Sequence, residues 1–429
     1  MVQKKYRNSS IFLSATVIVP SLFRVGVALG QEEVPTPPAS APSNVFSASQ
    51  SESALLGTSQ LASSPAAAPV SFGSPLRWGP VAFHPHLMYR LSYGDGLQAQ
   101  PGQQTKTLVN EVLPGLLFNV GDHWNLDYTP SLRFYSSSRF RDTTSHSVAL
   151  NGRTTYEDWA FGLSQRYASS SQPLVETASQ TDQESYATGL NANWLINTKL
   201  SLELGASQDF RFVNSSFPSL QLQDSRQWST TDWLNYQFVP QLGVALGGGG
   251  GYVNLSGSSD MVFENIQGRV TWKPTHKVSL TASGGIDIRQ FVDSPIPTLI
   301  SPIFSLAARY QPFEVTTLSL IASRAVNPSY FRGEITENTS VSANLSQRLL
   351  GKLTLGLGVG YGNSDYKAAV GGLNISRADD HASFDARLSA PFLKRGTAAV
   401  FYRHSENTSS DTGFSYSSSQ VGLELAYRF

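Results

Sequence analysis

Hydrophobic residues recur at every second position in short segments from Trp78 to the last residue, Phe429. A period of two is typical of a β-strand with one apolar face, because successive side chains of a strand point to opposite sides of the sheet. About eighteen such segments follow one another, and none shows the 3.6-residue period of a helix. In the first of them the apolar positions are Val81, Phe83, Leu87, Tyr89, Leu91 and Tyr93.

The connections between these segments alternate in length. After every second segment the connection is a short turn, at residues 121–123, 156–158, 197–199, 239–241, 273–277, 311–315, 350–352 and 393–396. Most of the others are longer and polar, at residues 170–182, 213–226, 327–336, 363–380 and 405–413. Such a division is typical of bacterial outer-membrane barrels. The sequence predicts an all-β fold, a transmembrane antiparallel up-and-down β-barrel of about 18 strands, with 16 as the alternative, short periplasmic turns and long external loops.

Charged residues test this prediction, because the lipid-facing side of a barrel strand excludes charge and the bore-facing side accepts it. In the strand segments the charges fall on the parity opposite the apolar row, so the apolar row is predicted to face lipid. Asp232 is the exception, since it shares its parity with Trp228 and Leu234, and we expect either a bulge at 230–232 or a different strand placement. The charges predicted to line the bore are Arg90, Asp127, Arg133, Arg166, Glu203, Asp209, Arg211, Arg269, Asp287, Arg289, Arg309, Asp385, Arg387, Glu424 and Arg428.

This inner set contains more arginines than acids. Two roles remain open for it: the charges constrict a pore and shape its electric field, or they pair with one another to fill a wide barrel. Aromatic residues near the short turns, among them Trp124, Trp194 and Trp272, predict an interfacial girdle, with a second girdle near the opposite strand ends.

The N-terminal residues differ from the rest of the chain. Residues 1–30 combine a basic start, a short apolar stretch at 11–23 and small residues before Gln31, which predicts a secretory signal peptide, with a membrane anchor as the alternative. Residues 31–76 are rich in Pro, Ala and Ser and predict a disordered periplasmic arm. Residues 77–429 are predicted to form the outer-membrane barrel.

Composition removes several classes of function. Lys and Arg together number 31, as do Asp and Glu, and the pI is about 7.1, so the chain lacks the basic surplus of a nucleic-acid binder. No cysteine occurs, which excludes disulfides, thiolate metal sites and a cysteine nucleophile. No cofactor is expected.

No residue pattern predicts catalysis or metal binding. The run LGGGGGY (246–252) lacks the Lys-Ser/Thr of a phosphate-binding loop and predicts a glycine kink in a strand, which allows strong curvature or the close approach of a loop folded into the lumen. His84 and His86 share a face, but no third metal ligand is evident. A hydrolase site at His146-Ser147 or His404-Ser405 lacks an orienting carboxylate, so we expect neither an enzyme nor a metal site.

The last nine residues, VGLELAYRF, place an apolar row on alternate positions and end on an aromatic residue. They are predicted to form the closing strand of the barrel. The row also predicts the signal by which the barrel-assembly machinery takes hold of its substrates, and its members are Leu423, Leu425, Tyr427 and Phe429.

Residues 270–291, 305–331 and 346–366 resemble the putative β-barrel porin-2 type of outer-membrane proteins. The resemblance rests on a strand that ends in a W-x-P-T or Y-x-P turn, here Trp272 to Thr275 and Tyr310 to Pro312, followed by an alternating strand and a long loop. Phe313 stands where the second motif would have threonine. The resemblance implies an outer-membrane barrel and, for many members, a link with capsule or exopolysaccharide export.

The sequence thus predicts an outer-membrane porin-like channel for hydrophilic solutes, with a link to polysaccharide export as a narrower expectation. The alternative is a non-conducting, plugged barrel that serves as a surface scaffold or binding module through its external loops. Expected partners are outer-membrane lipid and lipopolysaccharide, the assembly machinery, and a polysaccharide or other hydrophilic solute. Both termini are expected in the periplasm.

Overall fold

The computed structural model describes residues 76–215, 220–371 and 375–429. The chain divides into two units, Met1–Val45 and Phe46–Phe429, and all described residues belong to the second unit. The predicted signal peptide and arm lie outside the described residues, except for Leu76 at the start of the first strand. In the described part of the chain, no helix is long and apolar enough to cross a membrane.

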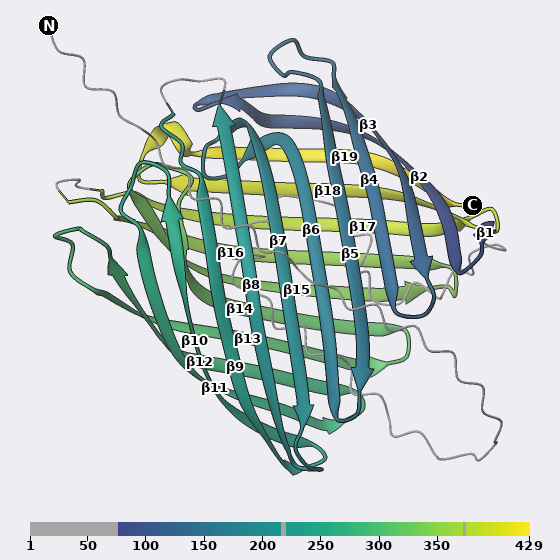
Figure 1. Ribbon diagram of the computed structural model, residues 1–429. Helices are drawn as coiled ribbons and strands as arrows, with labels where there is room; N and C mark the ends of the chain where they lie inside the picture. The colour runs from purple at the N-terminus through teal and green to yellow at the C-terminus, as the bar shows by residue number, and fades with distance from the viewer. Residues whose placement is uncertain (1–75, 216–219, 372–374) are drawn as a thin grey trace, which may run out of the picture. The chain divides into compact units, whose positions relative to one another are not determined.

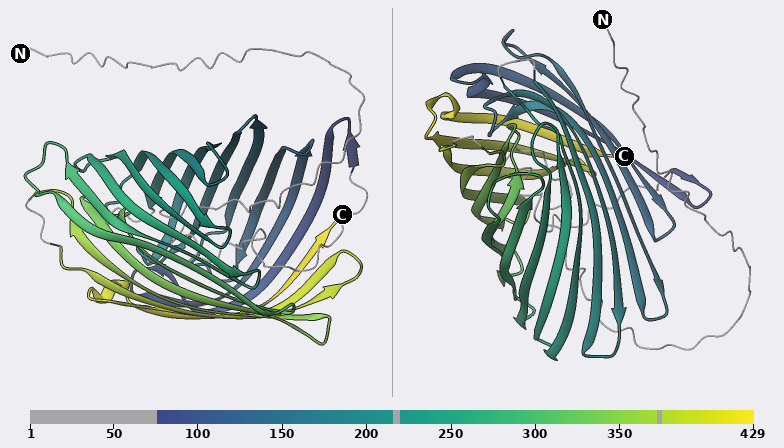
Figure 2. Two further views of the ribbon diagram at one scale, coloured as in Figure 1. Left: turned by 90° about the horizontal axis from the view of Figure 1, so that it is seen from below. Right: turned by 60° about the vertical axis from the view of Figure 1, so that its left-hand side comes forward.

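The described residues form one 19-stranded antiparallel sheet. The short strand β1 pairs with β2 alone, each strand from β2 to β18 pairs with the next, and β19 pairs back with β2, so 18 strands close a barrel. In Figure 1 the blue and teal strands cross in front of the green and yellow ones, and Figure 2 gives two further views. The prediction of about 18 strands is confirmed, and the alternative of 16 is wrong. The strands are β1 (Leu76–Trp78), β2 (Val81–Gln100), β3 (Gln103–Val120), β4 (Trp124–Tyr135), β5 (Thr143–Tyr156), β6 (Trp159–Leu174), β7 (Ser179–Leu195), β8 (Leu200–Ser215), β9 (Ser225–Val239), β10 (Leu242–Leu255), β11 (Met261–Thr275), β12 (Val278–Phe291), β13 (Leu299–Phe313), β14 (Thr316–Pro328), β15 (Glu334–Leu349), β16 (Leu353–Ala368), β17 (Ala378–Phe392), β18 (Gly396–Ser409) and β19 (Tyr416–Arg428), with a 3₁₀ turn at Thr412–Phe414.

The seam between the first and last long strands closes the barrel. Leu423 lies opposite Leu91 and Glu424 opposite Arg90, and the backbone N–H of Phe429 donates to the carbonyl of Pro85 at 3.0 Å. Because β19 and β2 are partners, neither strand is left as a free edge. Closure of this kind is the condition for a sheet to sit in hydrocarbon.

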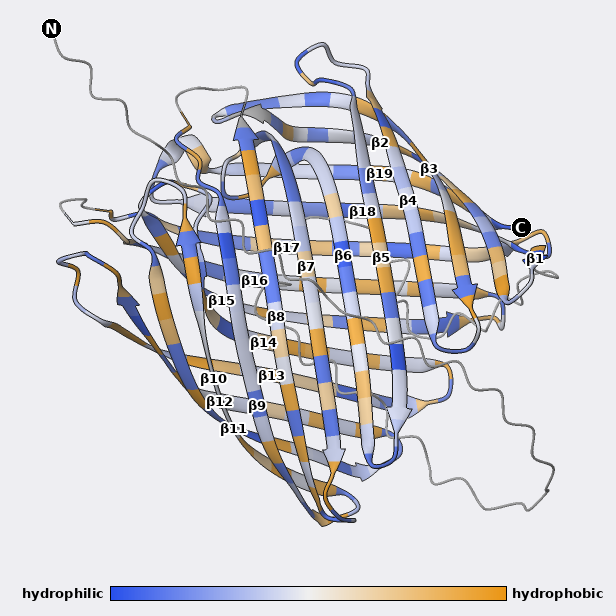
Figure 3. Cartoon of the chain, in the orientation of Figure 1, coloured by the Kyte–Doolittle hydropathy of each residue, from blue (hydrophilic) through white to orange (hydrophobic). Residues whose placement is uncertain are grey.

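Exposure alternates along the strands as the sequence predicted. The outer row is apolar and open to the surroundings: Leu246 is 67% exposed, Val359 53% and Leu190 52%. Figure 3 shows the resulting alternation of hydrophobic and hydrophilic residues along single strands. A soluble protein would not leave so many large apolar side chains uncovered, so the outer face suits lipid.

The short turns fall where the sequence placed them, for example residues 121–123 between β3 and β4, and 350–352 between β15 and β16. The opposite connections are shorter than expected, because the strands continue into the polar segments. The segment 170–182, expected to be a loop, is strand up to Leu174 and again from Ser179. Polar residues do not prevent backbone pairing, so the alternation of apolar residues underestimates the length of these strands.

Asp232 lies on the outer face, and both explanations offered for it from the sequence are wrong. The register of β9 with β8 and with β10 is continuous through residues 230–232, so no bulge turns the side chain inward. Asp232 is exposed on the side of Trp228 and Leu234, and its Oδ1 accepts a hydrogen bond of 3.4 Å from the backbone N–H of Gly205.

One hairpin leaves the wall at the end that carries the longer loops. The register of β13 and β14 ends at Phe304 and Arg324, although both strands continue beyond these residues. Beyond that point Val326 and Ile335, from β14 and β15, pack in a buried cluster with Val253 and Phe263, whose side chains belong to the inner face of β10 and β11. The end of the β14–β15 hairpin therefore lies inside the barrel.

The run of five glycines in β10 meets its neighbours differently on its two faces. A Cβ at Gly247, on the inner face, would stand 2.4 Å from the ring of Trp233, and one at Gly251 would stand 2.7 Å from the ring of Phe263. At Gly248, on the outer face, the nearest atom would be the carbonyl oxygen of Asn265 at 3.6 Å, an ordinary contact. The inner glycines thus give two aromatic rings of the neighbouring strands β9 and β11 room to lie on β10, whereas the sequence predicted a kink that allows strong curvature or the approach of a loop folded into the lumen.

We expect Gly247→Ala to destabilise the barrel and Gly248→Ala to leave it nearly unchanged. The first methyl group would collide with Trp233, and overpacking of this kind typically costs about 1–3 kcal/mol. The measurement is the thermal transition of the refolded barrel, followed by its heat-dependent shift on a denaturing gel. Equal stability of the two variants would contradict the packing described.

Candidate functional site

The inner wall carries a belt of shared carboxylates. The Glu111 carboxylate on β3 accepts hydrogen bonds from Arg90 on β2 at 2.9 Å and from Arg133 on β4 at 2.7 Å. Ser131 donates a third at 2.7 Å. Glu111 is 4% exposed, so these donors replace the water that the carboxylate loses on burial.

Glu424 extends the belt across the seam. Its carboxylate accepts from Arg90 at 2.9 Å, and from Nη1 of Arg387, on β17, at 3.1 Å. The guanidinium of Arg90 therefore joins two buried carboxylates, while 41% of the Arg387 side chain remains exposed. These connected contacts join three arginines to two acids, so the belt carries one positive charge in excess.

Two further arginines are held on the far side of the bore. Arg269 on β11 binds Glu203 and Asn235, both at 2.7 Å, and its guanidinium lies 4.3 Å from the ring centre of Trp233. Arg289 on β12 binds Asp287 at 2.7 Å and donates to the carbonyl of Val326 at 2.6 Å. The second contact ties the wall to the hairpin that enters the barrel.

The structure places the remaining predicted bore residues separately. Arg211 contacts the incoming hairpin, as described below. Asp127 is half-buried and accepts a hydrogen bond of 3.0 Å from Thr129, and the other members lie half-buried or exposed on the same face. Those other members are Arg166, Asp209, Arg309, Asp385 and Arg428. The structure joins part of the predicted set into clusters, and its role in constricting a pore stays a prediction.

Sequence reasoning missed Glu111, although this residue is the centre of the belt. The surrounding segment blurs the alternation, because Asn110 stands on the outer parity while Val109 and Leu113 stand on the inner one. The one signal in the sequence was the position of Glu111 in the alternation, since the alternate residues that share its side of the strand form no strong apolar row. Glu176 and Arg377 were missed for a different reason, since they lie outside the strands.

The tip of the β14–β15 hairpin is fixed by contacts from across the bore. Glu176, in the connection between β6 and β7, is 5% exposed; one carboxylate oxygen accepts from the hydroxyl of Ser329 and from the backbone N–H of Tyr330, the latter at 2.8 Å. Arg211 donates to the carbonyls of Pro328 and Ser329 at 3.0 and 2.8 Å. Its guanidinium also lies 3.9 Å from the ring centre of Tyr330.

Gln223, which precedes β9, is fully buried against the same tip. Its side-chain amide donates to the carbonyls of Ser329 and Glu334, both at 3.2 Å, and its backbone N–H donates to the backbone carbonyl of Tyr330 at 2.9 Å. The connections β6–β7, β8–β9 and β14–β15 are thus joined by hydrogen bonds inside the mouth of the barrel.

Arg377 adds a fourth connection, between β16 and β17. It donates to the backbone carbonyl of Glu176 at 2.9 Å and to Asp379 at 3.0 Å, and it lies 3.8 Å from the ring centre of Phe414. Burial alone would lower the pKa of Arg377, but the hydrogen bond to Asp379 and the charge of that carboxylate raise the pKa overall. The arginine therefore stays charged. We name the set Glu176, Arg211, Gln223, Ser329, Tyr330 and Arg377 the mouth cluster.

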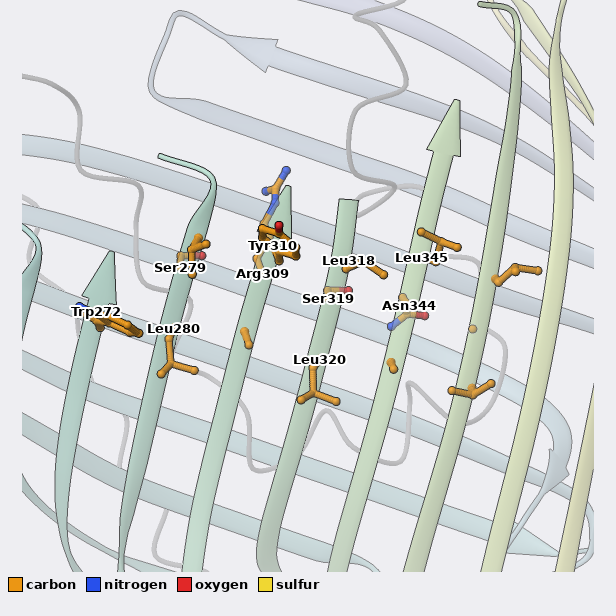
Figure 4. A pocket seen from close by; sticks show the side chains of 16 residues that line it. Trp272, Ser279, Leu280, Arg309, Tyr310, Leu318, Ser319, Leu320, Asn344 and Leu345 are labelled. Atoms are coloured by element: carbon orange, nitrogen blue, oxygen red, sulfur yellow. The ribbon is translucent and has the colours of Figure 1, made fainter. Parts of the chain in front are cut away.

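The outer face is also hollowed, over β11 to β16 near the short turns. A cavity of about 460 Å³ lies there, lined by Leu280, Leu320 and Leu345 among other apolar residues, with Trp272 and Tyr310 at its margin (Figure 4). Ala308, Ala343 and Gly358 contribute no bulk to its lining. The hollow continues the apolar band of the outer face.

The predicted assembly row lies at the seam. Leu423 and Leu425 are 54% and 46% exposed on the outer face, and the rings of Tyr427 and Phe429 contact each other with centres 4.9 Å apart. The residues form the closing strand and its end, as predicted. Recognition by the assembly machinery stays a prediction.

The histidines considered for catalysis have other partners. His146 lies 3.1 Å from the hydroxyl of Tyr128, and His404 lies 2.9 Å from the hydroxyl of Ser419. Within the described ranges, no group of three or more His, Cys, Asp or Glu residues is arranged to hold a metal ion.

The model of a protein family described as "Putative beta-barrel porin 2" matches residues 265–429. The predicted resemblance to this family is confirmed, and the matched residues extend to Phe429, beyond the quoted segments that end at residue 366. Among curated proteins, none matches.

Several solved structures are similar to this chain. OccAB3 of Acinetobacter baumannii is 9% identical, with a TM-score of 0.45 over 81% of this chain and 99% of its own. OccK11 (OpdR) of Pseudomonas aeruginosa is 15% identical, with a TM-score of 0.42 over 81% and 96%. OccK2 (OpdF) of Pseudomonas aeruginosa, in complex with glucuronate, is 13% identical, with a TM-score of 0.43 over 81% and 98%.

We expect Glu176→Ala to loosen the mouth cluster, because the hydroxyl of Ser329 and the N–H of Tyr330 lose a buried charged acceptor, at a cost of about 1.5–3 kcal/mol. Limited proteolysis between 328 and 334 should become faster. The control is Glu184→Ala, which removes an exposed acid from β7 in the same hairpin. Equal cleavage of both variants and the parent protein would show that Glu176 does not hold the tip.

Proposed function

We propose that the chain forms an outer-membrane channel through which small hydrophilic solutes pass, with a preference for anions. The observation that carries this proposal is the belt in which Arg90, Arg133 and Arg387 meet Glu111 and Glu424 on the inner face of a closed 18-strand barrel. A barrel of this size has room for an aqueous bore. Arginines in excess on its wall attract anions and repel cations.

The apolar outer face and the strand ends support an orientation. Short turns face the periplasm in bacterial outer-membrane barrels, and longer connections face outward. On this basis the two ends of the barrel lie in the periplasm, and the mouth cluster lies inside the end of the bore that opens to the cell surface.

A non-conducting barrel is the second candidate, and the mouth cluster favours it. Four connections meet inside the bore and bury Glu176 and Gln223, so the cluster narrows the external end. In that case the barrel acts through its outer surface and loops, as a scaffold or binding module. Measurement of conductance separates the two candidates directly.

Export of a polysaccharide is a narrower form of the channel proposal. Its support is the family resemblance over residues 265–429 and a bore lined by hydrogen-bonding groups. Genes for polysaccharide synthesis beside the gene for this chain would support it, and a chromosomal deletion strain with normal capsule and exopolysaccharide would count against it.

Purified protein in planar bilayers should give stepwise conductance. In a KCl gradient, the reversal potential should have the sign of an anion-selective channel. Arg387→Gln should lower the ratio of chloride to potassium permeability, because it removes the most exposed guanidinium of the belt. The change should be about twofold or more, since the loss of one nearby charge alters ion concentrations by that order.

Arg139→Gln is the matched control, because Arg139 is exposed in the connection between β4 and β5. Its selectivity should equal that of the parent. Folded protein without conductance steps would remove the channel proposal, and equal selectivity of Arg387→Gln and the parent would remove the role of the belt.

We further propose that the end of β19 is read by the barrel-assembly machinery. Deletion of Phe429 should reduce the amount of barrel in the outer membrane about tenfold or more, with unfolded chain in the periplasm, whereas Leu350→Ala, at an exposed short turn, should assemble normally. Cell fractionation and heat-modifiability gels give the readout. Normal outer-membrane levels of the truncated chain would limit Phe429 to packing.

A further inference from the structure

The hollow on the outer face of the barrel is produced by alanines in a row of larger side chains. Directly opposite one another across β12 to β16 lie, in order, Leu280, Ala308, Leu320, Ala343 and Val359. Both alanines line the hollow, and each lowers the surface between two larger neighbours. The hollow has a volume of about 460 Å³, and Figure 4 shows Leu280 and Leu320 around it. We call it the outer hollow.

Two aromatic rings mark the end of the outer hollow that lies near the short turns. Trp272 and Tyr310 are 45% and 48% exposed at its margin. Aromatic side chains with one polar edge lie where the hydrocarbon of a membrane meets the head groups. The outer hollow therefore begins at this interface and extends along the strands into the hydrocarbon.

Basic side chains adjoin the outer hollow at the same end. Lys273 follows Trp272 and Lys277 precedes Val278, two residues of the lining, and both lysines are exposed. The ammonium group of Lys277 donates to the carbonyl of Pro312 at 3.1 Å. This contact holds the ammonium group at the ends of β12 and β13 and uses one of its three donors.

The neighbouring short turns carry the same charge. From β11 to β18, the turns and adjoining strand ends at 273–277, 311–315, 348–352 and 393–396 hold six lysines and arginines and one acid, Glu314. From β3 to β8, the turns at 121–123, 156–158 and 197–199 hold three acids and one lysine. The positive charge is therefore concentrated on the strands that carry the outer hollow. We name this set the basic rim, and its members are Lys273, Lys277, Arg348, Lys352, Lys394 and Arg395.

An apolar hollow that ends at ammonium groups suits an amphiphile with an anionic head group. The leucines and alanines of the lining offer contact to a hydrocarbon chain, and a phosphate group at the lysines would accept charge-assisted hydrogen bonds. One water-sized group needs about 10–15 Å³ of this kind of volume, so the outer hollow has room for roughly 30–45 such groups. At least one acyl chain therefore fits.

A second copy of the chain suits the outer hollow less well. Two copies inserted into one membrane in the same direction have their short turns at the same level. A symmetric contact through the outer hollows would place one basic rim beside the other, and like charges repel. A phospholipid brings the opposite charge to the same place.

We propose that the outer hollow and the basic rim bind an anionic phospholipid of the periplasmic leaflet. An acyl chain lies over Ala308 and Ala343, and the phosphate group meets Lys273 and Lys277. The proposal rests on the outer-membrane location and the orientation given above, and it needs no conduction through the bore.

The test is native mass spectrometry of the full barrel released from detergent, titrated separately with phosphatidylglycerol and with phosphatidylethanolamine. The first lipid carries a net negative charge and the second carries none. We expect phosphatidylglycerol to bind at least about fivefold more tightly, because only its head group leaves a negative charge at the basic rim.

Two double variants separate the two parts of the site. Ala308→Leu with Ala343→Leu fills the outer hollow and should weaken the binding of both lipids about tenfold. Lys273→Gln with Lys277→Gln should lower the affinity for phosphatidylglycerol to that for phosphatidylethanolamine and leave the latter unchanged.

Two single variants are the matched controls. Ala206→Leu adds the same bulk at an exposed position on the outer face of β8, and Lys199→Gln removes an exposed lysine from the short turn between β7 and β8. Both should bind the two lipids as the parent does. Heat-modifiability gels show that each variant is folded before it is compared.

The outcomes are decisive. Equal affinity of the parent for the two lipids, or unchanged binding by the double leucine variant, would overturn the proposal. A parent mass of two chains, reduced to one by the double leucine variant, would show that a second copy fills the outer hollow and would overturn it too. Selective binding of phosphatidylglycerol by a barrel without conductance steps would keep the lipid site and remove the channel.

Discussion

Pairing of every backbone group within the sheet is the constraint on which the rest of this structure depends. Hydrocarbon offers no partner to a backbone N–H or C=O, so a sheet that enters it must close on itself. The contacts of β19 with β2, such as Leu423 opposite Leu91, complete that closure. Once the sheet is closed, alternation along each strand sends one side chain to lipid and the next to the bore, and chemistry is confined to the inner face and the strand ends.

The inner face shows how buried charged side chains are stabilised in the wall of a barrel. Glu111 and Glu424 are each almost fully buried, and each is shared by two arginines. Removing a charge from water costs several kcal/mol, and the cost is offset here because every buried oxygen faces a donor. The belt therefore both fits the barrel wall and leaves Arg387 partly open to the bore. Of the two roles considered from the sequence, pairing of the charges to fill the barrel describes the buried atoms of this cluster, and shaping the field of a pore stays a prediction.

Sequence reasoning reached the features that repeat and missed those that occur once. Strand number, parity and the short turns follow from a period of two, so each residue such as Leu423 is supported by its neighbours. The mouth cluster has no period: Glu176, Arg211 and Tyr330 come from three separate connections or strands and meet only because a hairpin turns inward. Asp232 shows the opposite failure, since the rule that acids avoid the outer face predicted a bulge or a different strand placement, and the continuous register of β9 excludes both.

The inward turn of the β14–β15 hairpin also bears on where the membrane ends. Pairing of β13 with β14 stops at Phe304 and Arg324, so beyond this point the two strands no longer satisfy each other's backbone groups. Hydrocarbon does not tolerate such an opening, whereas water and head groups do. The charges agree, because Glu337 binds Arg324 and Lys367 at 2.9 and 2.8 Å at this same end. We infer that the hydrocarbon boundary lies on the short-turn side of Phe304. The barrel tolerates a hairpin that bends into its bore because the bend lies outside the hydrocarbon.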